Sequence, residues 1–165
     1  ETIVNFTNSV LLDVSAPSCC IFFCEWSPRS TIYPWPEAAT PAQRRAHHRQ
    51  DLENRNGGSL GITGLRAMRM ATPDMHLHQR LWCALSGSQP SLSIALVEDI
   101  SLDLVPGEHL RVESLTLGVR SLRVARAFLA DHQLLQTDTG DLLTIACKDL
   151  SIHLREASFP QASAP

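Results

Sequence analysis

Val112-Glu113-Ser114-Leu115-Thr116-Leu117-Gly118-Val119 is followed directly by Arg120-Ser121 and then by Leu122-Arg123-Val124-Ala125-Arg126-Ala127-Phe128-Leu129. The first part alternates polar and apolar side chains, which predicts a strand with one buried face. Ser121 stands where an N-cap side chain accepts a hydrogen bond from the first turn of a helix. The last part places its apolar residues on one stripe, which predicts an amphipathic helix that ends near His132. The stretch therefore predicts a strand that turns sharply into a helix.

The same order of elements occurs earlier in the chain. A strand is predicted from Gly64 to Met70, a break follows at Ala71-Thr72-Pro73-Asp74, and a helix runs from Met75 to about Leu85 with Asp74 as its N-cap. Two short strands are expected after each helix, at Leu92–Val97 and Ser101–Leu104 in the first copy and at Leu142–Ala146 and Ser151–Leu154 in the second. Self-similarity at a fixed spacing indicates a duplicated βαββ module over residues 64–156, and hence an α+β fold.

The remaining segments are expected to surround this module. Residues 1–26 contain two apolar runs, Ser9–Val14 and Cys19–Trp26, and the residues between these runs are typical of a turn, so a hairpin is predicted. The second run lacks alternation, which is typical of a strand covered on both faces. Residues 27–63 form a Pro-rich crossover linker, in which Ala42–Asn54 is either a short solvated helix or a mobile segment. Residues 157–165 are predicted to be a disordered tail.

Composition narrows the class of protein. The net charge is −3 and no basic cluster dominates, so no nucleic-acid partner is expected. No apolar run approaches the ~20 residues that span a bilayer, so no membrane partner is expected either. The five cysteines lie among apolar neighbours and are expected to be buried, reduced thiols, which favours a cytoplasmic location.

The helix pattern Ser121-Leu122-x-x-Ala125-x-x-Phe128-Leu129, with its preceding strand and the paired strands after it, resembles the vicinal oxygen chelate superfamily of glyoxalases and dioxygenases. The chain is most similar there to glyoxalase-like domain proteins, through Ile21–Trp26, Tyr33-Pro34-Trp35-Pro36 and Leu60-Gly61-Ile62. The resemblance covers roughly residues 19–156. It implies a curved mixed sheet with helices on its convex face, and residues 1–26 would be the terminal strands of a truncated preceding module.

The resemblance also implies where a metal site would lie. The family's ligands are a His or Gln early in the first strand of a module and a Glu in the last strand, around an ion such as Zn, Fe, Mn or Ni. These positions fall on Ala67 and Ser114, which are not ligands, and on Asp103 and His153. His153 is therefore the candidate metal ligand, and the alternatives of no cofactor and of a single divalent metal stay open.

Strand alternation selects further candidate site residues. His153 lies between Ile152 and Leu154 and faces the other side of its strand, either into a polar site or into solvent; Asp103 has the same alternation. Arg66 and Arg69 are an odd number of residues apart and are expected on opposite faces, so only one of them, Arg69 as the candidate, would bind an anionic group. Ser114 and Thr116 share a face and would extend the site. His76 and His78, and likewise His47 and His48, are expected to be solvated.

Two functions follow from these residues. In the first, the protein is a glyoxalase-like small-molecule lyase or dioxygenase, with His153 and Asp103 as catalytic groups and Arg69, Ser114 and Thr116 as ligand-binding groups. In the second, it is a metal-free module that binds a small organic ligand, with Trp35 and Trp82 lining the site or packing in the core, or that serves as a dimerising scaffold. A small-molecule ligand is the expected partner, and a homodimer is an open alternative.

Overall fold

The fold was obtained as a computed structural model, which describes residues 5–17, 19–27, 39–55, 57–97 and 99–157. Its elements are β1 (Asn5–Val10), the short 3-10 helix η1 (Leu12–Val14), β2 (Phe22–Ser27), α1 (Pro41–Asn54), β3 (Ile62–Thr72), α2 (Met75–Ser86), β4 (Ser93–Val97), β5 (Ile100–Pro106), β6 (Arg111–Val119), α3 (Leu122–Asp131), β7 (Thr137–Asp138), β8 (Leu143–Cys147) and β9 (Leu150–Glu156). The predictions made for Tyr33–Pro36, including Trp35, and for the tail beyond Ala157 fall outside the described residues.

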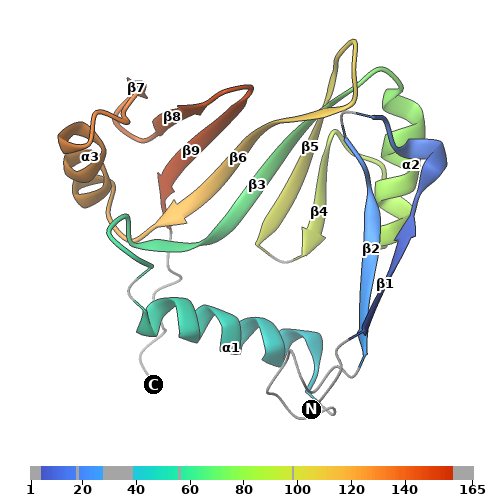
Figure 1. Cartoon of the computed structure of the whole chain (residues 1–165), viewed down its shortest axis with the longest axis horizontal. Helices are drawn as coiled ribbons and strands as arrows, with labels where there is room; N and C mark the ends of the chain where they lie inside the picture. The colour runs from blue at the N-terminus through green and yellow to red at the C-terminus, as the bar shows by residue number, and fades with distance from the viewer. Residues whose placement is uncertain (1–4, 18, 28–38, 56, 98, 158–165) are drawn as a thin grey trace.

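A curved seven-stranded sheet forms the body of the protein, in the order β4-β5-β3-β6-β9-β8-β7 (Figure 1). The central strands β3 and β6 are antiparallel, whereas β5 lies parallel to β3 and β9 lies parallel to β6. Each central strand thus begins a unit that continues through a helix and closes with a strand parallel to the first. The second unit has one strand more than predicted, the two-residue β7. The predicted α+β class with a curved mixed sheet is confirmed.

Both helices predicted for residues 64–156 are present and begin at the predicted caps. Asp74 Oδ1 accepts a hydrogen bond from the Leu77 amide at 2.8 Å, and Ser121 Oγ accepts one from the Val124 amide at 3.4 Å. These bonds satisfy amides of the first helical turn that have no partner within the helix. Gly87 ends α2 in the left-handed conformation, at φ 69°. This conformation is only slightly unfavourable for glycine, because glycine has no Cβ.

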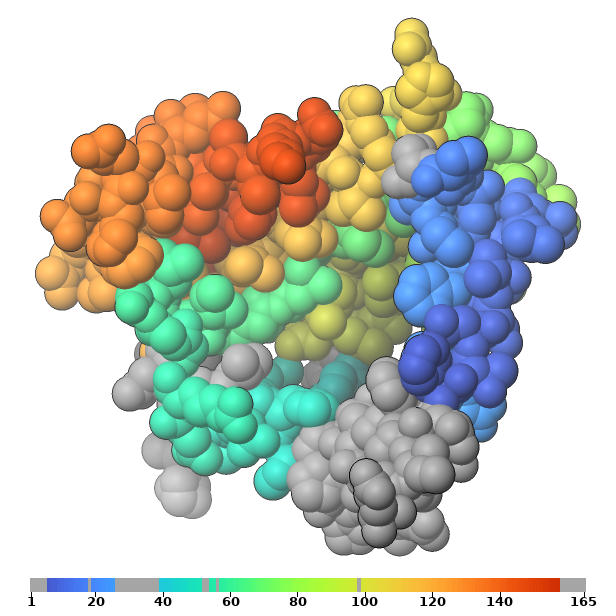
Figure 2. Space-filling view, viewed as in Figure 1, coloured from blue at the N-terminus to red at the C-terminus, as the bar shows by residue number. Residues whose placement is uncertain are grey.

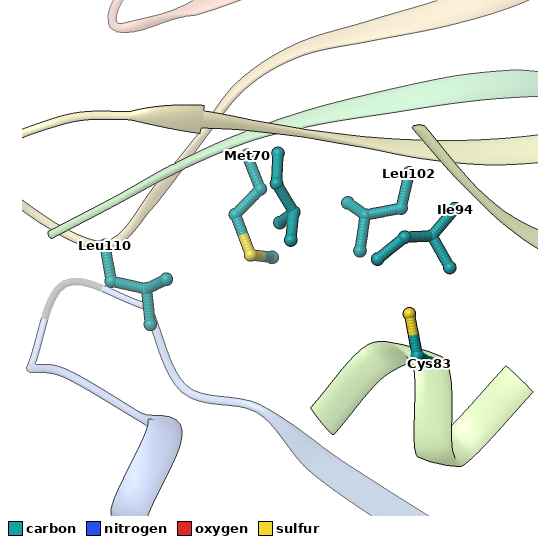
Figure 3. Close-up of a cluster of buried hydrophobic side chains, with 6 residues drawn as sticks. Met70, Cys83, Ile94, Leu102 and Leu110 are labelled. Atoms are coloured by element: carbon teal, nitrogen blue, oxygen red, sulfur yellow. The ribbon is translucent and has the colours of Figure 1, made fainter. Parts of the chain in front are cut away.

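The two helices pack on one face of the sheet and bury two apolar clusters there. Cys83 of α2 faces Met70, Ile94 and Leu102 from three strands (Figure 3). The second cluster lies between α3 and the sheet, and its fully buried residues include Leu129 of α3, Leu143 of β8 and Leu154 of β9. The paired residues Met68 of β3 and Leu115 of β6 lie on this same face, so both helices cover one side of a continuous sheet. The opposite side of the sheet is therefore left for a different set of side chains.

The N-terminal hairpin is present but differs from its prediction in two respects. β1 and β2 pair antiparallel from Asn5–Ser27 to Val10–Phe22, whereas the end of the first apolar run forms η1 instead of a strand. Phe22 and Phe23 are about half exposed, so β2 is not covered on both faces. The hairpin forms a sheet of its own, at the side of the molecule away from α3 (Figure 2). The loop between the two strands of the hairpin packs against the apolar cluster that contains Cys83 of α2, through Ala16, Cys19 and Ile21.

The segment expected as a linker contains a regular helix, α1. Thr40 and Gln43 form a reciprocal capping box, in which the Gln43 amide donates to Thr40 Oγ1 at 3.2 Å and the Thr40 amide donates to Gln43 Oε1 at 2.8 Å. Pro41 occupies the first helical position, where its missing N–H costs nothing. Arg49 ties the helix to the sheet through a 2.6 Å bond to Asp99. Of the two alternatives for this segment, the helix is correct.

The cysteines differ from their prediction as well. Cys83 is buried, but Cys20, Cys24 and Cys147 are exposed. The apolar neighbours that suggested burial belong to hairpin or edge strands, which have one open side. All five thiols are free. Among the described helices, none is long and apolar enough to cross a membrane.

Candidate functional site

The sheet face opposite α2 and α3 is lined by polar and small side chains, and is named the polar face here. Cross-strand pairing fixes its members, because directly paired residues lie on the same side of a sheet. Its floor consists of small residues from both units: Ala67, Ser101, Ser114, Thr116, Gly118, Thr144, Ala146 and Ser151. Four longer side chains lie on the same face, because their residues pair with members of the floor or with one another: Arg69, Asp103, His153 and Arg155.

All five predicted site residues lie on this polar face. Asp103 pairs with Arg69, and Arg69 pairs in turn with Ser114. Thr116 pairs with His153 across the β6–β9 ladder. The alternation of β5, β6 and β9 was therefore sufficient to place these residues on one side of the sheet. Their roles in binding or catalysis stay predictions.

His153 is half-buried and lies on the polar face between Thr116 of β6 and Thr144 of β8. Its Nδ1 lies 3.1 Å from Thr144 Oγ1, the side chain that faces it from β8. Burial lowers the pKa of His153 below its ordinary value of 6.5, and the positive charges of Arg155 and Arg69 lower it further. The imidazole is therefore neutral at pH 7. Because Thr144 occupies Nδ1, Nε2 is the nitrogen that can bond a ligand.

Asp103 and Arg69 lie opposite each other in the register but form their bonds elsewhere. Ser93 Oγ donates to Asp103 Oδ1 at 2.5 Å. Arg69 Nε lies 3.4 Å from Glu113 Oε2, and Arg111 lies 2.9 Å from the other oxygen of the same carboxylate. Glu113 reaches this network because it is the extra residue of a bulge between the pairs Arg69–Ser114 and Met70–Val112. The carboxylate of Asp103 is thus held by a hydroxyl and not by a guanidinium.

Arg66 also reaches the polar face, which corrects the prediction that Arg66 and Arg69 point to opposite sides. The ladder shifts register between Leu65 and Ala67, so simple alternation fails at Arg66. Gly118 faces the same side as Thr116, and a Cβ on Gly118 would meet Arg66 Nε at 2.7 Å. Arg66 therefore lies flat over the missing side chain of Gly118. Its Nη1 bonds Asp99 at 3.2 Å.

Arg155 is a member of the face that the sequence analysis did not single out. It follows His153 by two residues in β9 and pairs with Gly118. Alternation alone could have identified it, since every second residue of a strand shares a face. Arg155 is exposed, and forms no ion pair within the described part of the chain. Arg66 and Arg155 thus flank Gly118 from its two neighbouring strands.

The side chains around His153 do not fit a divalent metal. A metal with open positions needs two or three imidazole, thiolate or carboxylate ligands around one point. His153 is surrounded by Thr116, Thr144 and arginine charges. In residues 5–157, apart from the gaps given above, no group of three or more His, Cys, Asp or Glu side chains could hold an ion. The prediction of His153 as a metal ligand therefore lacks the partners that it requires.

Trp82 and His78 lie on the helix side of the sheet, away from the polar face. Trp82 of α2 packs against the apolar cluster under that helix and so does not line the polar face. His78 was expected in solvent but is 4% exposed, because it stands one turn before Trp82 on the packed side of α2. Its burial lowers the pKa of His78, which the nearby Asp74 partly offsets. Of the pair His76 and His78, only His76 is exposed.

Comparisons with known proteins find little. No protein-family model matches the chain, and no curated protein sequence matches it. Among solved structures, it is similar to methylmalonyl-CoA epimerase from Mycobacterium tuberculosis, with 16% identity and a TM-score of 0.44 over 65% of this chain and 95% of that one. Such a distant similarity assigns no activity or substrate. What the polar face can bind must follow from its own side chains.

Proposed function

We propose that this protein is a module of vicinal oxygen chelate type that binds a small polar molecule on its polar face without a metal ion. The proposal combines the resemblance seen in residues 112–129 with the architecture. Two units join at β3 and β6 into one curved sheet, and helices cover its outer face. The single observation that carries the proposal is the composition of the polar face, where both units contribute hydroxyl, imidazole and guanidinium groups around a floor of small residues.

The floor supports ligand binding because its small side chains carry hydroxyl groups beside an imidazole and guanidinium groups. Ser114 and Thr144 are buried although they are polar, and Thr116 and His153 are partly buried beside them. Buried hydroxyls usually have hydrogen-bond partners, and polar groups that converge on one place fix the orientation of a ligand.

The alternative, a lyase or dioxygenase reaction, has less support. It requires a Lewis-acidic ion, whose ligands are not assembled at His153, and a group that transfers a proton to or from the substrate. Asp103 and His153 lie on strands separated by three inter-strand spacings, roughly 14 Å measured along the sheet. Each is bonded to its own hydroxyl, Asp103 to Ser93 and His153 to Thr144. They do not form a catalytic pair.

The test uses protein from which metals have been removed with a chelator. Amide NMR spectra are recorded as representatives of five classes are added: 2-oxo acids, dicarboxylates, amino acids, nucleosides and monosaccharides. We expect at least one class to shift resonances of β6, β8 and β9 together, with no change when Zn, Fe, Mn or Ni is added. Shifts that occur only with added metal would support the enzyme alternative. No shift with any class would refute the proposal.

A further inference from the structure

The polar face carries positive charge on a protein that is negative overall. The strands of the face carry four guanidinium groups and two carboxylates, those of Arg66, Arg69, Arg111, Arg155, Asp103 and Glu113, and Arg49 of α1 and Asp99 of the β4–β5 turn extend this network. The whole chain has a net charge of −3. Positive charge is therefore gathered on one side of one sheet. This concentration attracts anions to the face.

The guanidinium groups nearest the floor are held around Gly118. Arg66 lies over Gly118, at a place where any side chain on that residue would collide with it. Arg155 stands opposite Gly118 in the register of β9. Arg66 is anchored by Asp99, which leaves its position fixed, whereas Arg155 has no carboxylate partner within the described residues. The guanidinium of Arg66 above Gly118 and that of Arg155 on the neighbouring strand can together bind a carboxylate through several charge-assisted hydrogen bonds.

The neighbouring groups match the rest of such a ligand. His153 is two residues from Arg155 on the same face, about 6.6 Å along the strand. Its neutral ring and the Thr116 hydroxyl can bond oxygen atoms without adding charge. The excess of guanidiniums over carboxylates favours a ligand with two negative charges over a ligand with one. A short-chain diacid can place one carboxylate between the arginines and the other towards His153 and Thr116.

We infer that the polar face binds a small organic dicarboxylate, held by Arg66 and Arg155 on either side of Gly118 and oriented by His153 and Thr116. The inference rests on the proposed function, because it names the ligand class of the same site. It assigns Arg155, which was not among the predicted site residues, as the main determinant of affinity.

The experiment compares malonate with malonamide, its neutral counterpart of similar shape, by amide NMR titration of the chelator-treated full chain. Malonate is expected to shift Thr116, Gly118 and His153, and malonamide is not. Arg155→Gln should weaken malonate binding about tenfold or more, because one charge-assisted pair is lost. Arg123→Gln removes the same charge from α3, on the other face of the sheet, and should leave the affinity unchanged. The spectrum of each variant without ligand reports whether the fold is intact.

Three results would overturn the inference. If malonamide or another neutral compound shifts the polar face and malonate does not, the face binds a neutral ligand, and the proposed function survives alone. If malonate binds but Arg155→Gln and Arg123→Gln weaken it equally, the effect is general electrostatics and not a built site. If no compound shifts the face, both the inference and the proposed function fail.

Discussion

Thr144 Oγ1 lies 3.1 Å from Nδ1 of His153, and this contact joins β8 and β9 on the polar face. It fixes the ring of a histidine that is neutral at pH 7 because of its burial and of the charges of Arg155 and Arg69. A neutral, oriented imidazole can donate or accept a hydrogen bond but adds no charge to the face.

The titration of His153 tests this environment. We expect its pKa, measured by NMR of the ring resonances, to lie below 6.5, and Arg155→Gln to raise it because one repelling charge is removed. The folded chain then binds fewer protons than the unfolded chain, so the stability linked to His153 falls as the pH drops from about 6.5 to the lower folded value. A pKa at or above 6.5 in the wild-type protein would contradict this description.

His78 provides a test of the helix side of the sheet. Its Nδ1 is buried and has no hydrogen-bond partner among the described residues. An apolar group removes that unsatisfied atom, so we expect His78→Leu to raise the free energy of unfolding by about 1 kcal/mol at pH 7, as measured by urea denaturation. The gain should increase below pH 6.5, where the unfolded histidine binds a proton that the folded one resists.

The matched control is His76→Leu, which changes an exposed residue of the same helix. It should leave the stability within about 0.5 kcal/mol of the wild-type value. If His78→Leu destabilises the protein, the buried ring has a partner that the structure does not show.

Gly118 is the position where a single methyl group should disturb the polar face. A Cβ there would lie 2.6 Å from Thr63 Oγ1 and 2.7 Å from Arg66 Nε. Thr63 is buried and cannot move away easily. We expect Gly118→Ala to cost about 1–3 kcal/mol and to shift the Arg66 side-chain NMR signal. An unchanged melting temperature together with an unchanged Arg66 signal would show that Arg66 does not cover Gly118.

The cap of α3 can be tested in the same way. Ser121→Ala removes the acceptor of the Val124 amide and should cost about 1 kcal/mol. The cost is limited because Glu156 Oε2 accepts the neighbouring Leu122 amide at 3.1 Å. Ser121→Ala combined with Glu156→Ala should therefore cost more than the two single changes together. Strict additivity in thermal unfolding would mean that the two acceptors act independently.

The sequence predicted the elements of residues 64–156 well, because their signals are local. Ser121 and Asp74 begin the helices as expected, and alternation placed His153, Thr116 and Asp103 on one face. Alternation failed at Arg66, since a bulge inserts one residue and leaves no mark in the spacing. The family resemblance suggested a metal, but it could not reveal that hydroxyls and arginines surround His153.

Burial was the other property that local patterns misjudged. The apolar run around Phe22 and Phe23 suggested a covered strand, yet it forms part of a two-stranded sheet with an open side. His78 looked like a surface residue but packs beside Trp82. In each case the outcome depends on which distant segment covers the residue. The homodimer and the cytoplasmic location stay predictions.

The claim that the polar face functions without a metal is tested most directly by plasma mass spectrometry of the purified protein, with His153→Ala alongside. We predict that Fe, Mn, Ni and Zn are far below one ion per chain in the wild-type protein and are unchanged in the variant. Near-stoichiometric metal in the wild-type protein that disappears in His153→Ala would make His153 a ligand and would contradict the proposed function.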